Sequence, residues 1–322
     1  MRLWVRHGWI IRRLGVAVLS LWVVSVVVFM ATQALPGDAA VAILGRQATP
    51  EAVAIMRADL GLNRPLVTQY VDWFGGVLVG DFGESVGSGA PISDLIGSRI
   101  VNTAVLLVVS AVIIFPAGIA LGVFAALRRD GPLDRVFSVT TPAMNALPAF
   151  VVGLVLVILF GTTVWKIFPA TALFPPGEFP LRHPDVMVLP VATLVLSTVP
   201  YLALIVRATT IEALESDYVQ MARLKGLRPR TVVLVHALPN VVVPILQTGA
   251  VILGHLAGGV VVVEFLFRYP GLGTSLTNAV SARDLALIQA STLLLAAAIV
   301  VINLIADILT VQLTPRLRTA ET

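Results

Sequence analysis

The chain has 322 residues, of which 57% are hydrophobic and only 12% are charged. A soluble domain usually carries about twice that share of charge, so a soluble globular protein is excluded and the length is better counted in membrane spans. The chain has no cysteine, which excludes disulfides and thiol chemistry. Its net charge of +4 does not indicate a nucleic acid partner, because membrane proteins distribute Lys and Arg unevenly between the two sides of the membrane.

Six long apolar stretches could each cross a bilayer, whose core of about 30 Å needs about 20 helical residues. In chain order they are 14–35, 100–127, 136–165, 186–206, 237–263 and 285–306. They are too long for barrel strands, and backbone in lipid must satisfy its own hydrogen bonds, so each is predicted to be a helix. We treat the prolines and glycines within them as ordinary features of packed membrane helices. The predicted fold is an all-α polytopic membrane protein with six transmembrane helices.

The first apolar stretch follows Arg2, Arg6, Arg12 and Arg13, as the core of a secretory signal peptide would. Its run of about 21 residues exceeds the 7–15 of a signal core, so we predict a retained helix. Residues 1–35 then form an N-terminal tail and the first transmembrane helix. The majority of the Lys and Arg residues fall on the side of these arginines, which predicts that both termini face the cytosol.

Residues 36–99 are predicted to form a small extracytoplasmic helical segment. Thr49 is a plausible N-cap with Pro50 at the first helical position, and Gly61 stands where this helix would stop. A second helix around Trp73 could follow, before the glycine-rich stretch GDFGESVGSG. The remaining predicted units are a core of five transmembrane helices over residues 100–313 and a cytosolic tail over residues 314–322.

The loop 207–240 of this core contains the polar stretch DYVQMARLKGLRPRTVVLVHALPN, between the fourth and fifth apolar stretches. Ser216 or Asp217 can cap a helix that begins at Tyr218. Gly226 suits the left-handed residue that ends a helix, and Pro229 prevents the helix from resuming. The sequence therefore predicts a helix of about two turns with both ends fixed.

One face of this short helix should carry Tyr218, Met221, Ala222 and Lys225, by the i, i+3, i+4 spacing. A basic juxtamembrane loop held to anionic lipid is the alternative interpretation. Attraction to lipid needs positive charge but no defined helix ends. The residues that fix both ends of this helix therefore favour a helix that fits a groove of another protein.

Polar residues within the predicted spans usually face the bundle interior or a water-filled cavity. Asn145 and His255 are our candidates for lining such a route. Asn303 and Asp307 are expected instead to hydrogen-bond to neighbouring helices. Glu264 is expected to pair locally with Arg268, four residues later on the same helix.

The sequence contains no recognisable catalytic constellation. It has no Gly-rich loop followed by Lys and Ser or Thr that would hold nucleotide phosphates. Its four histidines are scattered along the chain, so no metal site is expected, and no serine lies in a Gly-x-Ser-x-Gly context. We therefore predict a chain without catalytic residues or a cofactor of its own.

A family resemblance rests first on the polar loop. Gly226 is followed thirteen residues later by Pro239, which leucine precedes, as in the "EAA…G…LP" loop of ABC importer permeases. The triplet itself reads Gln220-Met221-Ala222, so only its last residue matches. The loop is closer to the form "DYVxxARxKGL…HALxN", and the sequence resembles the B-type permease subunit of dipeptide and oligopeptide importers. Further similar segments, in order along the chain, are LPGDAA, LGLNRPLVTQY, GDFGES, LDR, LPAF, VVVVEFLFRYPGLG, RD and TPRLR.

The resemblance implies a bacterial inner-membrane importer in which two permease subunits form the pathway. Its expected partners are a C-type permease subunit, two cytosolic ATPase subunits that bind ATP and Mg²⁺, and an extracytoplasmic solute-binding protein. The loop would act as a coupling helix through Asp217, Tyr218, Met221, Ala222, Arg223, Lys225, Gly226 and Leu227. A turn at Tyr269, Pro270, Gly271 and Gly273 would be where the binding protein docks.

The resemblance favours short peptides as cargo, with metal chelates, haem or sugar-like molecules as alternatives within the same class. An ATP-independent secondary transporter or channel is the alternative from another class. It would be expected to show related halves or ionisable pairs at the membrane midplane, and the sequence shows neither. A structural membrane scaffold would accommodate the polar loop but not the motifs of residues 36–99.

Overall fold

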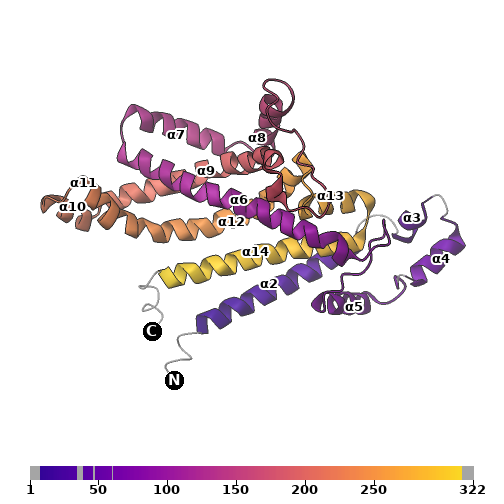
Figure 1. Cartoon of the computed structure of the whole chain (residues 1–322). Coiled ribbons are helices and arrows are strands. Elements are labelled where there is room, and N and C mark those ends of the chain that lie inside the picture. The colour runs from indigo at the N-terminus through magenta and orange to yellow at the C-terminus, as the bar shows by residue number, and fades with distance from the viewer. Residues whose placement is uncertain (1–7, 35–38, 46–47, 60, 314–322) are drawn as a thin grey trace.

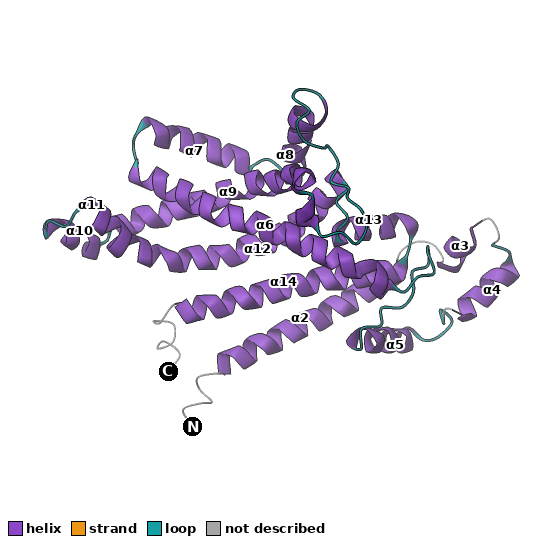
Figure 2. Cartoon of the chain, viewed as in Figure 1, coloured by secondary structure: helices purple, strands orange, loops and turns teal. Residues whose placement is uncertain are grey.

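The computed structural model describes residues 8–34, 39–45, 48–59 and 61–313. Within these ranges the ordered elements are helices and no strand forms (Figure 2). Five helices are long and apolar enough to cross a membrane. They are α2 (Gly8–Gln33), α6 (Ile92–Leu127), α9 (Pro184–Glu215), α12 (Leu238–Phe267) and α14 (Leu285–Leu313). The prediction of an all-α polytopic membrane protein is confirmed.

The third predicted span is not one continuous helix. It is broken into α7 (Pro132–Asn145) and α8 (Ala149–Leu156), which continues as a π-helical turn to Thr162, and the two halves meet at an angle of 101°. Pro148 stands at the break with an extended ψ of 143°, and the residue before a proline disfavours the α conformation. Treating this proline as ordinary was therefore wrong, and the described residues contain five candidate crossings, or six if the bent pair is one span. The second half, α8, packs against α9 and α12, with Val152, Gly153 and Leu156 buried (Figure 1).

The segment between the first two long helices forms three short helices, α3 (Ala39–Leu44), α4 (Pro50–Asp59) and α5 (Leu66–Leu78). Thr49 caps α4 as predicted, since its hydroxyl oxygen accepts a hydrogen bond from the Ala52 N–H at 3.3 Å. In α5, Tyr70 packs edge-on against Phe29 of α2, with ring centroids 5.5 Å apart. The boundary that we placed at residue 99 falls inside α6, which begins at Ile92.

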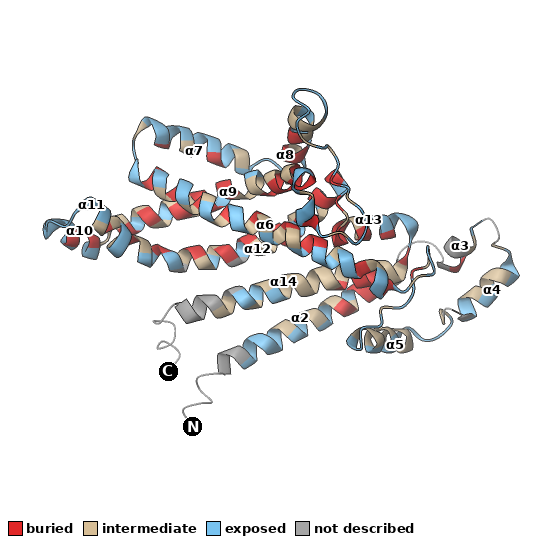
Figure 3. Ribbon diagram, in the orientation of Figure 1, coloured by how far each residue is buried: buried red, intermediate tan, exposed pale blue. Residues whose placement is uncertain are grey.

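The closest helix pairing of the core joins α6 to α9. A Cβ added to Gly118 would lie 2.6 Å from Leu202 Cδ2, and one added to Gly122 would lie 2.6 Å from the Ala203 carbonyl oxygen. The Gly-x-x-x-Gly spacing thus lets two helix backbones approach, as small residues do in membrane proteins. Figure 3 shows the buried residues concentrated where α6, α9 and α12 meet, while α2 and α14 are more exposed.

Neither α3 nor the helix that follows α12 was predicted. The short α13 (Leu272–Ala282) lies between α12 and α14 and packs against both, as well as against α6. It lies at the end of the bundle that also carries α3 to α5 (Figure 1). The start of α2 and the end of α14 lie toward the other end, where α10 (Asp217–Leu224) and α11 (Pro229–Thr231) are found.

Candidate functional site

The short helix α10 has the ends that the sequence predicts. Ser216 occupies the N-cap position with an extended backbone, although its hydroxyl donates to the Ala213 carbonyl and caps no N–H. Gly226 ends the helical region in the left-handed conformation, with φ of +76°. Its N–H donates to the Arg223 carbonyl at 2.9 Å, and Pro229 then begins a separate helical turn. Local residue types therefore mark both ends of this helix.

The face of α10 that remains accessible differs from the predicted one. Ala222 is only 5% exposed and packs inward together with Val219, because α10 lies against α9 and the start of the helix leading into α12. Tyr218 and Met221 are exposed as expected, and Leu224 is the most exposed apolar residue of α10, at 81%. The inclusion of Ala222 among accessible contact residues is corrected, and Leu224 is added.

The polar residues that we assigned to this loop lie around the same tip. Asp217, Arg223 and Lys225 are exposed, as are Gly226 and Leu227 at its base. Arg223 stands in the last turn of α10, where a cation is favourable for the helix dipole. The tip therefore presents exposed apolar side chains surrounded by basic groups.

Two ion pairs connect the root of this loop to the turn between α6 and α7. Arg207 of α9 forms a bidentate pair with Asp134 of α7, with distances of 2.7 and 2.8 Å from Nε to Oδ1 and from Nη2 to Oδ2. Arg129 pairs with Glu215, the last residue of α9. Sequence analysis missed both pairs, because the partners lie more than 70 residues apart and on different helices.

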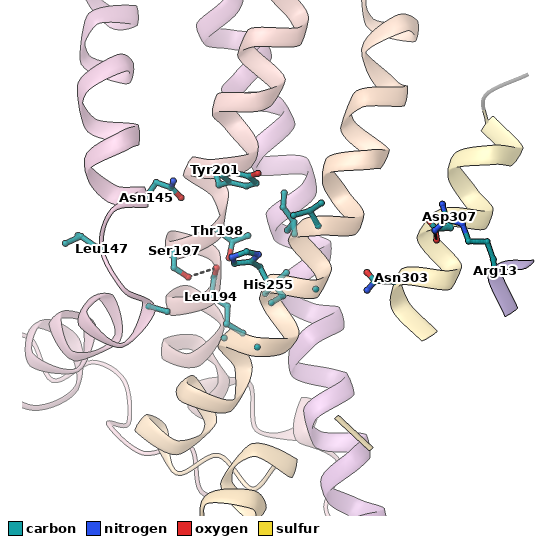
Figure 4. A pocket seen from close by; sticks show the side chains of 17 residues that line it. Arg13, Asn145, Leu147, Leu194, Ser197, Thr198, Tyr201, His255, Asn303 and Asp307 are labelled. Carbon is teal, nitrogen blue, oxygen red and sulfur yellow. Dashed lines mark hydrogen bonds and ion pairs between the residues drawn. The ribbon is translucent and has the colours of Figure 1, made fainter. Parts of the chain in front are cut away.

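A large groove opens at membrane depth between the helices and has a volume of about 1070 Å³. Both predicted route residues, Asn145 and His255, lie in its wall. Figure 4 shows them with the polar side chains of α9, while Asn303 and Asp307 of α14 lie across from them. The full lining comprises Arg13, Asn145, Leu147, Ala149, Leu194, Ser197, Thr198, Tyr201, Val251, Ile252, Gly254, His255, Leu256, Gly258, Gly259, Asn303 and Asp307.

The largely apolar groove also carries accessible polar side chains, which is unusual for a helix surface at this depth. Asn145, His255 and Asn303 are all exposed. Polar groups in contact with hydrocarbon are costly, so such a surface is expected to face protein or a water-filled cavity. Ser197, Thr198 and Tyr201 were missed, although their spacing on one predicted helix placed them on a single face.

Asp307 meets the expectation that it bonds to a neighbouring helix. Its carboxylate accepts a hydrogen bond from Arg13 of α2, and the two side chains form an ion pair at one end of the groove. Asn303 lines the groove and is exposed. The pair joins the first and last long helices, whose packing against one another is extensive.

Glu264 lies far from solvent, and its predicted pairing with Arg268 is wrong. Its carboxylate is fully buried and accepts hydrogen bonds from the Thr103 hydroxyl at 2.6 Å and from the N–H of Gly273, also at 2.6 Å. A longer bond of 3.3 Å comes from the Thr274 N–H. Arg268 instead takes the left-handed conformation that ends α12.

These contacts provide hydrogen-bond acceptors for the N–H groups at the N-terminus of α13. A helix leaves its first N–H groups without partners inside the helix. The N–H of Leu272 donates to Thr103 Oγ1 at 2.9 Å, and the next two donate to Glu264. The N-cap residue is Gly271, which has no side chain to contribute, and a Cβ there would collide with the Glu264 carboxylate. Side chains of α6 and α12 therefore cap α13.

The turn at residues 269–273 is an internal element, which corrects the prediction that it is a docking surface. Tyr269 is fully buried, and its hydroxyl donates to the Asn102 carbonyl at 2.8 Å. Gly271 and Gly273 are also buried, and the carbonyl of the half-buried Pro270 accepts a bond of 2.8 Å from the Asn102 amide. Burial raises the pKa of the Tyr269 phenol, which keeps its proton for this bond.

Long apolar helices, a groove between them and a short capped helix at one end indicate a multi-pass membrane protein. Residues 118–319 match the family described as binding-protein-dependent transport system inner membrane component, and residues 7–121 match its N-terminal region. The chain belongs to this family, and it is therefore an inner-membrane permease subunit of a binding-protein-dependent ABC importer, which works with ATPase and solute-binding partners.

Several relatives are similar over nearly their whole length. A probable peptide ABC transporter permease of Sinorhizobium fredii is 34% identical over 96% of this chain and 99% of its own. A putative peptide transport system permease of Brucella abortus is 35% identical over 96% and 98%. The glutathione transport system permease protein of Escherichia coli K12 is 34% identical over 97% and 99%.

Proposed function

We propose that this chain forms half of an import pathway for short peptides and that α10 couples the pathway to a cytosolic ATPase subunit. The observation that carries the proposal is the build of α10, a helix with fixed ends whose Tyr218, Met221 and Leu224 side chains stay exposed. An exposed apolar face on a short helix suits a groove of another protein. A rigid helix also passes on a rigid-body movement that a flexible loop would absorb.

Peptide cargo has two supports. The first is the printed names of the relatives, which refer to peptide and glutathione transport. The second is the chemistry of the groove, whose amide, hydroxyl and imidazole groups can bond to the N–H and C=O groups of a peptide. Metal chelates, haem and glycosides are the cargoes that a direct uptake measurement must exclude.

In this proposal the chain itself is not catalytic. ATP and Mg²⁺ bind to two cytosolic ATPase subunits, and a solute-binding protein delivers cargo at the end remote from α10. The start of α2 and the end of α14 lie toward the α10 end, which in this proposal is the cytosolic end. A C-type permease subunit supplies the second wall, because the polar face of the groove needs protein or water against it at membrane depth.

Copurification of the chain with co-expressed partner subunits tests the coupling. Leu224→Asp places a charge on the most exposed apolar residue of α10. Burying such a side chain contributes about 1.5–3 kcal/mol, so the variant should retain the ATPase subunits about tenfold or more weakly. Val79→Asp is the matched control, since Val79 is equally exposed (82%) but lies after α5 at the other end. Equal recovery of ATPase subunits with both variants would contradict the role of α10.

A second experiment separates docking from transmission. Gly226 has φ of +76° and open space around the position of a Cβ, so a side chain there acts only through the backbone. Valine disfavours this conformation, whereas asparagine tolerates it. We expect Gly226→Val to abolish ATP-driven cargo uptake in proteoliposomes, and Gly226→Asn to preserve it. Unchanged uptake by the valine variant would count decisively against a coupling role.

A further inference from the structure

The wall of the groove carries very few charges. Of the seventeen residues that line it, only Arg13 and Asp307 have a full charge, and the two are paired with each other. The remaining polar groups are amides, hydroxyls and the His255 imidazole. Figure 4 shows the charged pair on α2 and α14, across from the polar cluster of α9 and α12.

The pair is accessible to a solute in the groove. The Arg13 side chain is 55% exposed and that of Asp307 is 29% exposed. One guanidinium nitrogen, Nη1, bonds to Asp307, and a guanidinium has five N–H donors in all. Both partners can thus bond to a passing molecule while remaining close to one another.

Paired opposite charges nearly cancel at a distance, whereas an unpaired charge in a partly desolvated site acts strongly on nearby ions. A short peptide with free termini carries one ammonium and one carboxylate. The ammonium can bind to Asp307 and the carboxylate can bind to Arg13. Such a peptide can therefore replace the contact between the two side chains without leaving either of them unpaired. An arginine is suited to this exchange because it binds carboxylates through more than one N–H.

We propose that the Arg13–Asp307 pair determines the charge selectivity of the pathway, by keeping this wall neutral for zwitterionic cargo. The proposal rests on the proposed function, peptide import. A purely structural alternative exists, in which the pair only fastens α2 to α14. That alternative predicts that breaking the pair alters the uptake of every cargo in the same direction.

The experiment measures uptake of Ala-Ala, Ala-Lys and Ala-Glu into proteoliposomes that contain the complete transporter, with each peptide saturating the binding protein. Uptake of the two charged peptides is divided by that of Ala-Ala at one fixed pH. The variants are Arg13→Gln, Asp307→Asn and the double variant. Arg12→Gln is the matched control, because Arg12 is the exposed neighbour and does not line the groove.

Arg13→Gln leaves an unpaired carboxylate and should raise the Ala-Lys ratio and lower the Ala-Glu ratio by roughly three- to tenfold, the size expected of one nearby charge. Asp307→Asn should shift both ratios in the opposite direction. The double variant and Arg12→Gln should stay near the wild-type ratios. Arg13→Lys, which keeps the charge, provides the comparison if Arg13→Gln assembles poorly.

Ratios that stay constant in both single variants, or that move in the same direction in both, would overturn the inference and leave the pair as a structural fastening. Peptide uptake by the wild type would then still support the proposed function. A wild-type transporter that hydrolyses ATP and imports none of the three peptides would overturn peptide cargo, and the charge-selectivity inference with it.

Discussion

Replacing Glu264 by alanine should loosen the N-terminus of α13. The substitution removes the acceptor for the Thr103 hydroxyl and for two N–H groups at the start of α13. Thr103 and Gly273 are buried and Thr274 is half-buried, so water does not readily replace the lost acceptor, and Gly271 at the N-cap offers no side chain in its place. The first turn of α13 then loses its hydrogen bonds to Glu264 and keeps the bond from Leu272 to Thr103, while α13 still packs against α12 and α14.

The expected cost follows from the bonds that are lost. A hydrogen bond to a charged group contributes about 1.5–3 kcal/mol, so the two bonds of 2.6 Å together account for about 3–6 kcal/mol. The empty volume left by the side chain adds to this cost. Glu264→Gln should cost only about 1–2 kcal/mol, because its amide oxygen can still accept from Gly273 and its NH₂ group can donate to the Thr103 oxygen.

Thermal unfolding of the purified, assembled transporter and hydrogen exchange of residues 272–282 measure the effect. We expect Glu264→Ala to lower the unfolding temperature and to speed exchange throughout α13, with Glu264→Gln between it and the wild type. Arg268→Gln serves as the control, because it removes the partner that helical spacing alone would assign to Glu264. Unchanged exchange in Glu264→Ala, or an equal effect of Arg268→Gln, would refute the capping role of the carboxylate.

Two further predictions concern the helix contacts on either side of α9. Gly122→Leu should separate α6 from α9 and lower the free energy of unfolding by at least about 1–3 kcal/mol through overpacking. Gly97→Ala in the same helix meets open space and should leave stability unchanged. Size-exclusion chromatography after heating distinguishes the two variants. Arg207→Gln leaves the buried Asp134 without its bidentate partner and should cost about 3–5 kcal/mol, visible as a lower yield of monodisperse protein. The charge exchange Arg207→Asp with Asp134→Arg should recover part of the lost stability. No recovery would show that the ion pair itself does not account for the loss.

The features that the sequence predicted well are those that depend on residues close together in the chain. The ends of α10 follow from Gly226, which accepts a positive φ, and from Pro229, which starts a new turn. The Thr49 cap of α4 is equally local. Asn145 and His255 could be named as candidates because polar residues in apolar helices rarely face lipid, but only the structure shows that they line the same groove.

The features that the sequence did not predict depend on geometry between distant segments. Glu264 accepts a hydrogen bond from Thr103, which lies 161 residues away in the chain, and no spacing rule on one helix can indicate such a partner. The break at Pro148 was visible as a residue type, but a proline is compatible with either a mild kink or the 101° bend observed here. Burial of Tyr269 depends on α13, a helix too short and too polar to register as a span.

The open polar face of the groove also bears on how the chain survives before it is assembled. A newly inserted copy without a second wall holds Asn145, His255 and Asn303 against acyl chains, an unfavourable arrangement for the isolated subunit. We therefore expect the cellular abundance of this chain to follow the supply of its partner, with rapid turnover when it is synthesised alone.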